Sequence, residues 1–173
     1  MTHIHSFSPI SNEDSHVLLL GSMPGKESLV KNEYYAHSRN SFWRIMELVL
    51  GIPVGLSYLE RTTALLNQGI ALWDVLKTCT RDSSLDSDII ESSIICNNFE
   101  YFYKSHPRKF KVFFNGKKAE NSYMKNVWPK LSDDNKKIDH FGLPSTSPTN
   151  AHKTFDEKLS AWKTINITKG VKF

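Results

Sequence analysis

Two stretches of the sequence bring glycine, proline and small polar residues together with side chains that can act on a ligand. The first joins Gly21-Ser-Met-Pro-Gly25 to Tyr34-Tyr-Ala-His-Ser-Arg-Asn40-Ser-Phe-Trp43, and the second is Leu143-Pro-Ser-Thr-Ser-Pro-Thr-Asn150. Glycine and proline form turns that bring main-chain N–H groups close to a ligand. A side-chain amide such as that of Asn40 is no general base, so its chemistry is limited to positioning water or stabilising charge.

Other catalytic patterns are missing. No Walker pattern is present and no G-x-G-x-x-G follows the first expected strand, which disfavours a nucleoside triphosphatase or a dinucleotide oxidoreductase. An α/β hydrolase acting on a nucleotide or small glycoside would need an acid pair or a Ser/His/Asp set at the strand ends, and no convincing set is found. Cys79 and Cys96 cannot form a cysteine-only zinc site, and two cysteines are typical of a reduced, cytosolic protein.

Length and composition indicate one globular domain. The chain has 173 residues, of which 39% are hydrophobic and 12% aromatic, too many for a disordered chain. We expect a single domain over residues 1–173, with residues 1–15 and 166–173 flexible. The longest strongly apolar run, residues 17–20, is too short to span a bilayer, and residues 1–14 lack the features of a signal peptide. We therefore expect a monomeric, cytoplasmic protein with no membrane partner, associated with the nucleoid if it is prokaryotic.

Positive charge is concentrated in two parts of the chain. There are 22 Lys and Arg residues against 18 Asp and Glu, a net charge of +4. Residues 104–118 hold six basic residues and no acid, and the tail beyond His152 is also lysine-rich, whereas residues 82–91 hold four acids. A positive face of this kind is expected of a protein that binds a phosphate backbone.

Apolar runs alternate with helical patterns along the chain. Residues 16–21 form a continuous apolar run that ends at glycine, as in a parallel strand buried on both faces. Strands alternating with helices predict a parallel sheet with helices on both sides. The predicted strands are 16–21, 69–75, 110–116 and 137–143, and the predicted helices are 41–50, 62–68, 99–106, 117–127 and 155–165.

This architecture predicts where a ligand binds. In open α/β sheets the site lies beyond the carboxyl ends of the strands. The residues that follow those ends are 22–25, Asp74, Asn115 with Gly116, and 143–150. The two chemical motifs are therefore expected at the same edge of the sheet.

Together the two motifs resemble those of the uracil-DNA glycosylase superfamily, and within it most closely the DNA-deoxyinosine (hypoxanthine-DNA) glycosylases. The resemblance extends from about residue 17 to residue 162, with residues 69–76 and 113–116 as supporting segments. It implies a three-layer α/β/α sandwich around a short, mainly parallel four-stranded sheet. It also implies hydrolysis of the N-glycosidic bond of a deaminated base, hypoxanthine or also uracil, flipped out of DNA. The implied partner is DNA containing deaminated bases, and the reaction needs no metal and no other cofactor.

The resemblance also implies which residue is catalytic. Mismatch-specific uracil glycosylases carry Gly-Ile-Asn-Pro-Gly in the first loop, where the Asn positions the attacking water. Met23 stands there in this chain, and a thioether cannot orient water usefully. The deoxyinosine family uses the Asn that follows His-x-Arg, which is Asn40 here. Asn40 is also placed to be a plain helix N-cap, and the two roles can coexist.

Further residues are expected to contact the base. Tyr34 and Tyr35 are predicted to stack on it, the alternative being one ring in the core and one at the surface. Asp74 and Asn115 stand at strand ends where members of the superfamily place base-reading groups. The alternatives are that backbone amides satisfy Asp74 and that Asn115 forms a turn before Gly116. With the first loop included, the predicted base-binding residues are Ser22, Met23, Tyr34, Tyr35, Asp74 and Asn115.

The remaining residues are expected to contact DNA. His37 is a candidate for sugar, base or phosphate contact, and Arg39 for a phosphate contact or a salt bridge that braces the loop. The second motif implies a loop that enters the minor groove and grips phosphates. The predicted DNA-binding residues are His37, Arg39, Ser145, Thr146, Ser147, Pro148 and Lys153.

A second hypothesis remains open. Because Met23 occupies the water-positioning place of the first loop, the chain is alternatively a catalytically weakened relative that recognises damaged or single-stranded DNA without excising a base.

Overall fold

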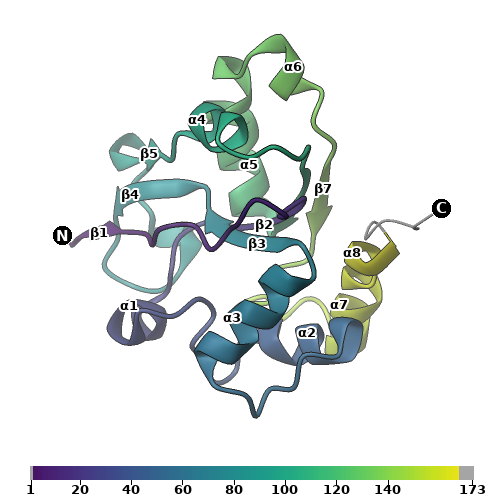
Figure 1. Ribbon diagram of the computed structural model, residues 1–173. Helices are drawn as coiled ribbons and strands as arrows, with labels where there is room; N and C mark the ends of the chain where they lie inside the picture. Colours follow the sequence, from purple (N-terminus) through teal and green to yellow (C-terminus); the bar gives the residue numbers. More distant parts are fainter. Residues whose placement is uncertain (1, 168–173) are drawn as a thin grey trace.

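A parallel sheet forms the centre of the protein, described over residues 2–167 by a computed structural model (Figure 1). Its strands lie in the order β3-β2-β6-β7, and every neighbouring pair is parallel, which confirms the predicted sheet. Because parallel strands end at the same edge of a sheet, the carboxyl ends of all four meet there. The strands are β2 (Val17–Gly21), β3 (Ile70–Asp74), β6 (Lys111–Asn115) and β7 (His140–Leu143).

Helices cover both faces of this sheet, which confirms the predicted three-layer α/β/α sandwich (Figure 1). Leu18 and Leu20 of β2 belong to one hydrophobic cluster, whereas Val17 and Leu19 belong to the other. This alternation explains the continuous apolar run of β2, because a strand covered on both faces has no polar side. One face carries α4 (Phe99–Lys104), α5 (Lys117–Asn126) and α6 (Asp133–Lys136), and the other carries α2 (Phe42–Leu50), α3 (Tyr58–Asn67), α7 (Phe155–Trp162) and α8 (Thr164–Ile167).

A second, smaller sheet was not predicted. Its order is β1-β4-β5, and it is antiparallel; the strands are β1 (His3–His5), β4 (Leu76–Thr80) and β5 (Ile95–Cys96). Residues 2–15, expected as a flexible arm, belong to the fold, since β1 pairs with β4 and Ile10 pairs with Leu72. A three-residue strand has no recognisable apolar period, because its partner supplies the pairing. Of the other segment expected to be flexible, residues 166 and 167 belong to α8, and 168–173 lie outside the described residues.

Short elements connect the layers. Helix α1 (Lys26–Lys31) follows the first motif, and the 3-10 turns η1 (Asp86–Asp88) and η2 (Glu91–Ser93) lie between β4 and β5, with η3 (Trp128–Lys130) after α5. Helix α3 begins four residues before the predicted start, because Ser57 and Glu60 form a capping box. None of the helices within residues 2–167 is long and apolar enough to cross a membrane.

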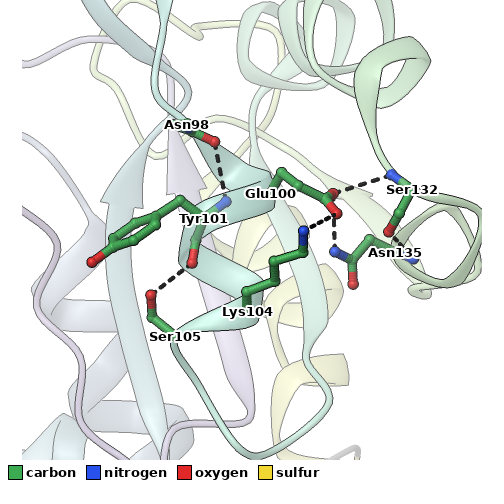
Figure 2. Close-up of polar contacts among 7 residues, drawn as sticks. All are labelled: Asn98, Glu100, Tyr101, Lys104, Ser105, Ser132 and Asn135. Atoms are coloured by element: carbon green, nitrogen blue, oxygen red, sulfur yellow. Dashed lines mark hydrogen bonds and ion pairs between the residues drawn. The ribbon is translucent and has the colours of Figure 1, made fainter.

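Polar contacts hold α6 against α4 in one outer layer (Figure 2). Asn98 caps α4, its Oδ1 accepting the N–H of Tyr101 at 3.1 Å. Glu100 accepts hydrogen bonds from the main-chain N–H of Ser132 at 3.1 Å and from Nδ2 of Asn135 at 3.0 Å. The carboxylate of Glu100 thus joins α4 to the start of α6.

Gly116, at the carboxyl end of β6, is the position where the sheet meets the second motif. Its φ of 93° and ψ of 164° belong to a region that glycine alone adopts readily, and a Cβ there would lie 2.9 Å from Cβ of Ser145. We predict that Gly116→Ala lowers the free energy of unfolding by about 1–3 kcal/mol, measured by urea denaturation. The matched control is Gly55→Ala, because nothing lies within 4 Å of a Cβ at Gly55. Equal effects of the two substitutions would contradict this account.

Candidate active site

The carboxyl ends of the parallel strands open into a pocket of about 280 Å³. Both motifs line it: residues 21–25 of the first loop and residues 145–149 of the second lie on the same cavity. Every residue predicted to be catalytic, base-binding or DNA-binding lines this pocket except Lys153. The two motifs, more than 100 residues apart in the chain, therefore form one site.

Thr146 joins the three segments that form the pocket wall. Its main-chain N–H donates to Oδ1 of Asn115 at 2.9 Å, and its hydroxyl accepts from Nδ2 of Asn115 at 2.9 Å. Its carbonyl accepts from both the N–H and the hydroxyl of Ser41, at 3.0 and 3.2 Å. The side chain of Thr146 is buried, so these bonds are shielded from water. Both ends of the Asn115 amide hold Thr146, and a base-reading role for Asn115 stays a prediction.

The carbonyls of residues 144–147 in the second loop accept hydrogen bonds. Trp162 Nε1 donates to the carbonyl of Pro144 at 2.9 Å, and Asn150 Nδ2 donates to that of Ser145 at 3.1 Å. Lys158 Nζ donates to the carbonyl of Ser147 at 3.3 Å, and burial lowers the pKa of this lysine. With the carbonyl of Thr146 bound to Ser41, four consecutive acceptors are satisfied within the protein. The hydroxyls of Ser145 and Ser147 accept the N–H groups of Ser147 and Thr149, which leaves each hydroxyl able to donate its proton to a phosphate.

Gly21, Asp74 and Tyr35 converge at the floor of the pocket. Gly21 pairs with Asp74 across the β2–β3 ladder. A Cβ at position 21 would lie 2.5 Å from Oδ1 of Asp74 and 3.1 Å from the hydroxyl of Tyr35. Only glycine leaves room there for the carboxyl and the phenol together. The role of Gly21 is therefore close approach of side chains, in addition to turn formation.

Asp74 is buried without the partners that a carboxylate needs. Its exposed fraction is 3%, and Oδ2 has no hydrogen-bond partner among residues 2–167. Burial, with the negative charge of Asp86 adding to it and Arg81 opposing it, raises the pKa of Asp74 to about 7. The alternative prediction was that backbone amides satisfy this carboxyl group. It is wrong for Oδ2, which no amide of residues 2–167 bonds. A strained acid in a cleft is a candidate functional group.

The two tyrosines have different surroundings. Tyr34 is 3% exposed, its hydroxyl donates to the carbonyl of Ser8 at 3.0 Å, and its carbonyl accepts from Nε1 of Trp43. Tyr35 is half-buried with φ of 56°, and its ring stacks on Phe42 at a centroid distance of 4.0 Å. A left-handed φ is costly for a residue with a side chain, and such strain is typical of functional sites. Tyr35 is therefore the better-placed candidate for stacking on a ligand.

Asn40 lies at the start of α2. Its Oδ1 accepts the main-chain N–H of Phe42 at 3.0 Å, but the N-cap of α2 is Ser41, so the alternative that Asn40 is the N-cap is wrong. Because that N–H requires an acceptor, the orientation of the amide is defined and Nδ2 is the end left for the pocket. Asn40 can therefore bond the start of the helix and offer a donor to a ligand at the same time.

The other motif residues differ in what they can do. Met23 is 7% exposed and packs in the hydrophobic core. His37 accepts the N–H of Arg39 at Nδ1, at 3.1 Å, within the turn that ends at Asn40. Arg39 is exposed, and its guanidinium therefore faces solvent at the mouth of the pocket.

The sequence reasoning missed five residues that line the pocket, namely Lys26, Glu27, Ser28, Ser84 and Asp86. Asp86 of η1 lines the pocket and accepts a hydrogen bond from the hydroxyl of Ser22 at 2.7 Å. Arg81, 3% exposed, lies behind it and donates to the carbonyl of Pro24. The acidic run 82–91 was the available signal, but without β4 nothing placed it near the first motif.

The basic residues only partly follow the predicted face. Lys104, Arg108, Lys109 and Lys111 precede β6 or begin it, so they lie toward the end of the strand opposite to the pocket. Lys153 follows the second motif and makes an exposed ion pair with Glu157 at 3.9 Å. Such surface pairs contribute little and leave the lysine able to contact a phosphate. The lysines at 169 and 172 lie outside the described residues.

Comparison with known proteins agrees with this geometry. The family model described as the uracil DNA glycosylase superfamily matches residues 8–166. This chain belongs to the uracil DNA glycosylase superfamily. The resemblance predicted from the two motifs is confirmed, and with it the class of enzyme, a DNA glycosylase.

Named relatives lie within the same superfamily. A hypoxanthine DNA glycosylase of Methanosarcina barkeri is 37% identical over 114 residues, which cover 65% of this chain and 71% of that protein. A hypoxanthine DNA glycosylase of Methanosarcina acetivorans is 34% identical over 114 residues, with the same coverage. A solution NMR structure from Methanosarcina acetivorans, described as a candidate uracil DNA glycosylase, has a TM-score of 0.78 and 29% identity. That comparison covers 95% of this chain and 97% of the other.

The buried acid of this glycosylase should govern how its stability varies with pH. The pKa of Asp74 is raised to about 7 in the folded protein, above the value near 4 expected in the unfolded chain. Between these values the folded state keeps a proton that the unfolded state has released, so stability falls as pH rises from about 4 to 7. We predict that Asp74→Asn raises the free energy of unfolding at pH 8 by about 2–4 kcal/mol relative to the unsubstituted protein.

The measurement is urea denaturation at pH 5 and pH 8. Asp139→Asn, at an exposed aspartate, is the control and should alter neither value appreciably. A variant Asp74→Asn that is no more stable than the unsubstituted protein at pH 8 would show that the carboxyl is not strained.

Proposed function

We propose that this protein is a base-excision DNA glycosylase that hydrolyses the N-glycosidic bond of a flipped-out deaminated base, with hypoxanthine as its principal substrate and uracil as a second one. The observation that carries the proposal is the single pocket in which both motif loops meet Tyr35, Asp74 and Asn40. Two relatives at 37% and 34% identity, both named hypoxanthine DNA glycosylase, support the choice of base.

The pocket suits one base. Its volume of about 280 Å³ is at the lower end of the range for small-molecule sites, roughly 300–1,000 Å³. A dinucleotide does not fit such a space, whereas one heterocycle does. Tyr35, supported from behind by Phe42, supplies a stacking surface that accepts a purine.

The residues present suit a reaction that develops charge on both fragments. Cleavage of the N-glycosidic bond gives the sugar oxocarbenium character and leaves negative charge on the base. A fixed N–H donor beside the base stabilises that charge without reorganising. Asn40 Nδ2 is such a donor, because the bond from Phe42 holds the opposite end of the amide. The same group can hold the water that attacks the sugar.

The second loop is suited to grip the DNA backbone. The carbonyls of residues 144–147 are bonded inside the protein, so these acceptor oxygens, which would repel a phosphate, are turned away. The hydroxyl groups of Ser145 and Ser147, with Lys153 beside them, remain to contact phosphates. Its rigidity also limits the ordering cost of binding.

We predict that Asn40→Ala lowers the rate of hypoxanthine excision about 100- to 1,000-fold, as loss of one preorganised donor typically does. The assay uses an end-labelled duplex containing one deoxyinosine or one deoxyuridine, followed by alkaline cleavage of abasic sites. The unsubstituted protein should release hypoxanthine faster than uracil.

The variant Asn40→Asp separates the proposed donor role of Asn40 from its bond to the start of α2. The aspartate retains an oxygen that accepts the N–H of Phe42, but it lacks the amide donor. It should keep the thermal stability of the unsubstituted protein and still lose excision. Full activity of Asn40→Asp would contradict the donor role.

The second candidate function is damage recognition without excision, favoured by Met23, which lines the pocket in place of a polar residue. It predicts tight, salt-sensitive binding to inosine-containing DNA and no product at high enzyme excess. That result would overturn the enzymatic proposal.

Lys153→Gln should weaken binding to duplex DNA about two- to tenfold and reduce the slope of affinity against salt concentration by about one ion. Fluorescence anisotropy at several salt concentrations measures both quantities. Lys109→Gln is the control, since Lys109 precedes β6, away from the pocket. Equal losses in the two variants would contradict the proposed DNA path.

A further inference from the structure

The pocket contains a second carboxyl group, that of Asp86, which the proposed reaction does not use. Asp86 lies on η1, between the strands of the smaller sheet, and enters the pocket beside the first loop. The hydroxyl of Ser22 donates to its Oδ1 at 2.7 Å. Ser22 directly follows Gly21, whose strand partner is Asp74. Asp86 therefore bonds Ser22, and Asp74 pairs with Gly21, the residue that directly precedes Ser22.

The two carboxyl groups have unequal support for negative charge. Loss of hydration in the pocket raises the pKa of Asp86, but the Ser22 hydroxyl and the positive charges of Arg81 and Lys118 all oppose that rise. Asp74 has Arg81 on its side but no hydrogen bond to Oδ2 within the described part of the chain. Three tyrosines feel the charge of Asp74, and all are neutral near pH 7, because burial first, with this charge adding to it, raises the pKa values of Tyr34, Tyr35 and Tyr58.

Asp74 is 3% exposed, whereas Asp86 is an exposed residue, so Asp74 is the acid more fully removed from water. A negative charge near such a buried acid disfavours its ionisation further. When the pair holds one proton, the proton occupies the acid whose ionised form is less well supported. Asp74 is that acid, because hydrogen bonds and charges to the ionised form favour Asp86. The direction of the pKa shift agrees, since the charge of Asp86 raises the pKa of Asp74.

We propose that Asp86 is a specificity-determining positioning residue, whose Ser22-bound carboxylate keeps the proton of the pair on Asp74, so that Asp74 meets the flipped base as a neutral carboxyl group. This inference rests on the proposed function, because it assigns the form in which Asp74 reads the base. Asp86 acts through Asp74 and Ser22.

The protonation state decides what Asp74 can recognise. A neutral carboxyl group offers one O–H donor and one carbonyl acceptor, whereas a carboxylate offers acceptors alone. Deamination creates a ring edge with a carbonyl oxygen beside an N–H, as in hypoxanthine and uracil. The neutral group matches both atoms of that edge, and the carboxylate would place an unmatched negative charge against the carbonyl oxygen. Asp74 therefore recognises this edge below its pKa of about 7.

The test follows Asp74 directly and through excision. Carboxyl carbon NMR of the ¹³C-labelled full chain gives the titration of Asp74. Excision of hypoxanthine from duplex DNA, measured as kcat/KM from pH 5.5 to 9, shows how the protonation of Asp74 affects the reaction. Excision should fall about tenfold per pH unit above the pKa of Asp74, because the protonated fraction falls by that factor.

Three variants isolate the role of Asp86. Asp86→Asn keeps an oxygen that accepts from Ser22 but removes the charge, so both the titration of Asp74 and the falling limb of excision should move to lower pH by about one unit. Asp88→Asn is the matched control: it removes a carboxylate two residues away that bonds Ser83 and does not line the pocket, and neither curve should move. Asp74→Asn supplies a donor and an acceptor at every pH, so the falling limb should disappear.

The outcomes separate this inference from the proposed function. Excision with the same falling limb in Asp86→Asn and the unsubstituted protein overturns the inference alone. An unmoved titration of Asp74 in Asp86→Asn does the same. Failure to excise any deaminated base overturns the proposed function, and the readout with it, whatever the NMR titration shows. The role of Asp86 is established if Asp86→Asn shifts both the titration of Asp74 and the falling limb of excision to lower pH, while Asp88→Asn shifts neither.

Discussion

The pocket depends on the buried hydrogen bonds of Thr146. Through them the end of β6, the start of α2 and the second loop are held together, although these segments are far apart in the chain. The amide of Asn115 matches the N–H and hydroxyl of Thr146 with one acceptor and one donor, and no group in this junction is charged. Neutral, fully paired bonds are stable when buried, because neither partner loses ionic hydration. The loops can therefore be rigid before DNA arrives.

Asp74 follows the opposite rule. One of its carboxyl oxygens has no hydrogen-bond partner among residues 2–167, and burial raises its pKa to about 7. Gly21 shows that the space around it is built for the carboxyl group, since even a methyl group there would collide with it. A buried carboxyl group with a raised pKa at the carboxyl ends of the strands is a candidate for contact with a ligand. The stable junction at Thr146 and the strained acid at Asp74 are thus complementary parts of one site.

Most of the basic residues within residues 2–167 that were predicted to form a positive face do not lie at the pocket. Much of the basic segment 104–118 lies toward the far end of β6 or is paired, as Arg108 is with Asp14 and Lys117 with Glu120. The charges that shape the pocket are instead the buried Arg81 and the acids Asp74 and Asp86. A few charges in a low-dielectric site outweigh many in water, because solvent screens the latter.

The sequence by itself determined the parallel sheet and most of the site. The apolar run of β2 is typical of a strand covered on both faces, and motif residues that follow parallel strands meet at one edge of the sheet. It could not reveal β1, whose pairing is supplied by β4, nor the place of Asp86, whose hydrogen bond to Ser22 joins residues 64 positions apart. Local patterns carry periodicity and turn chemistry, but the pKa of a carboxyl group depends on what is packed around it. The tertiary structure alone therefore decided that Asp74 is buried with a raised pKa, and that Tyr34 is buried whereas Tyr35 is half-buried at the pocket.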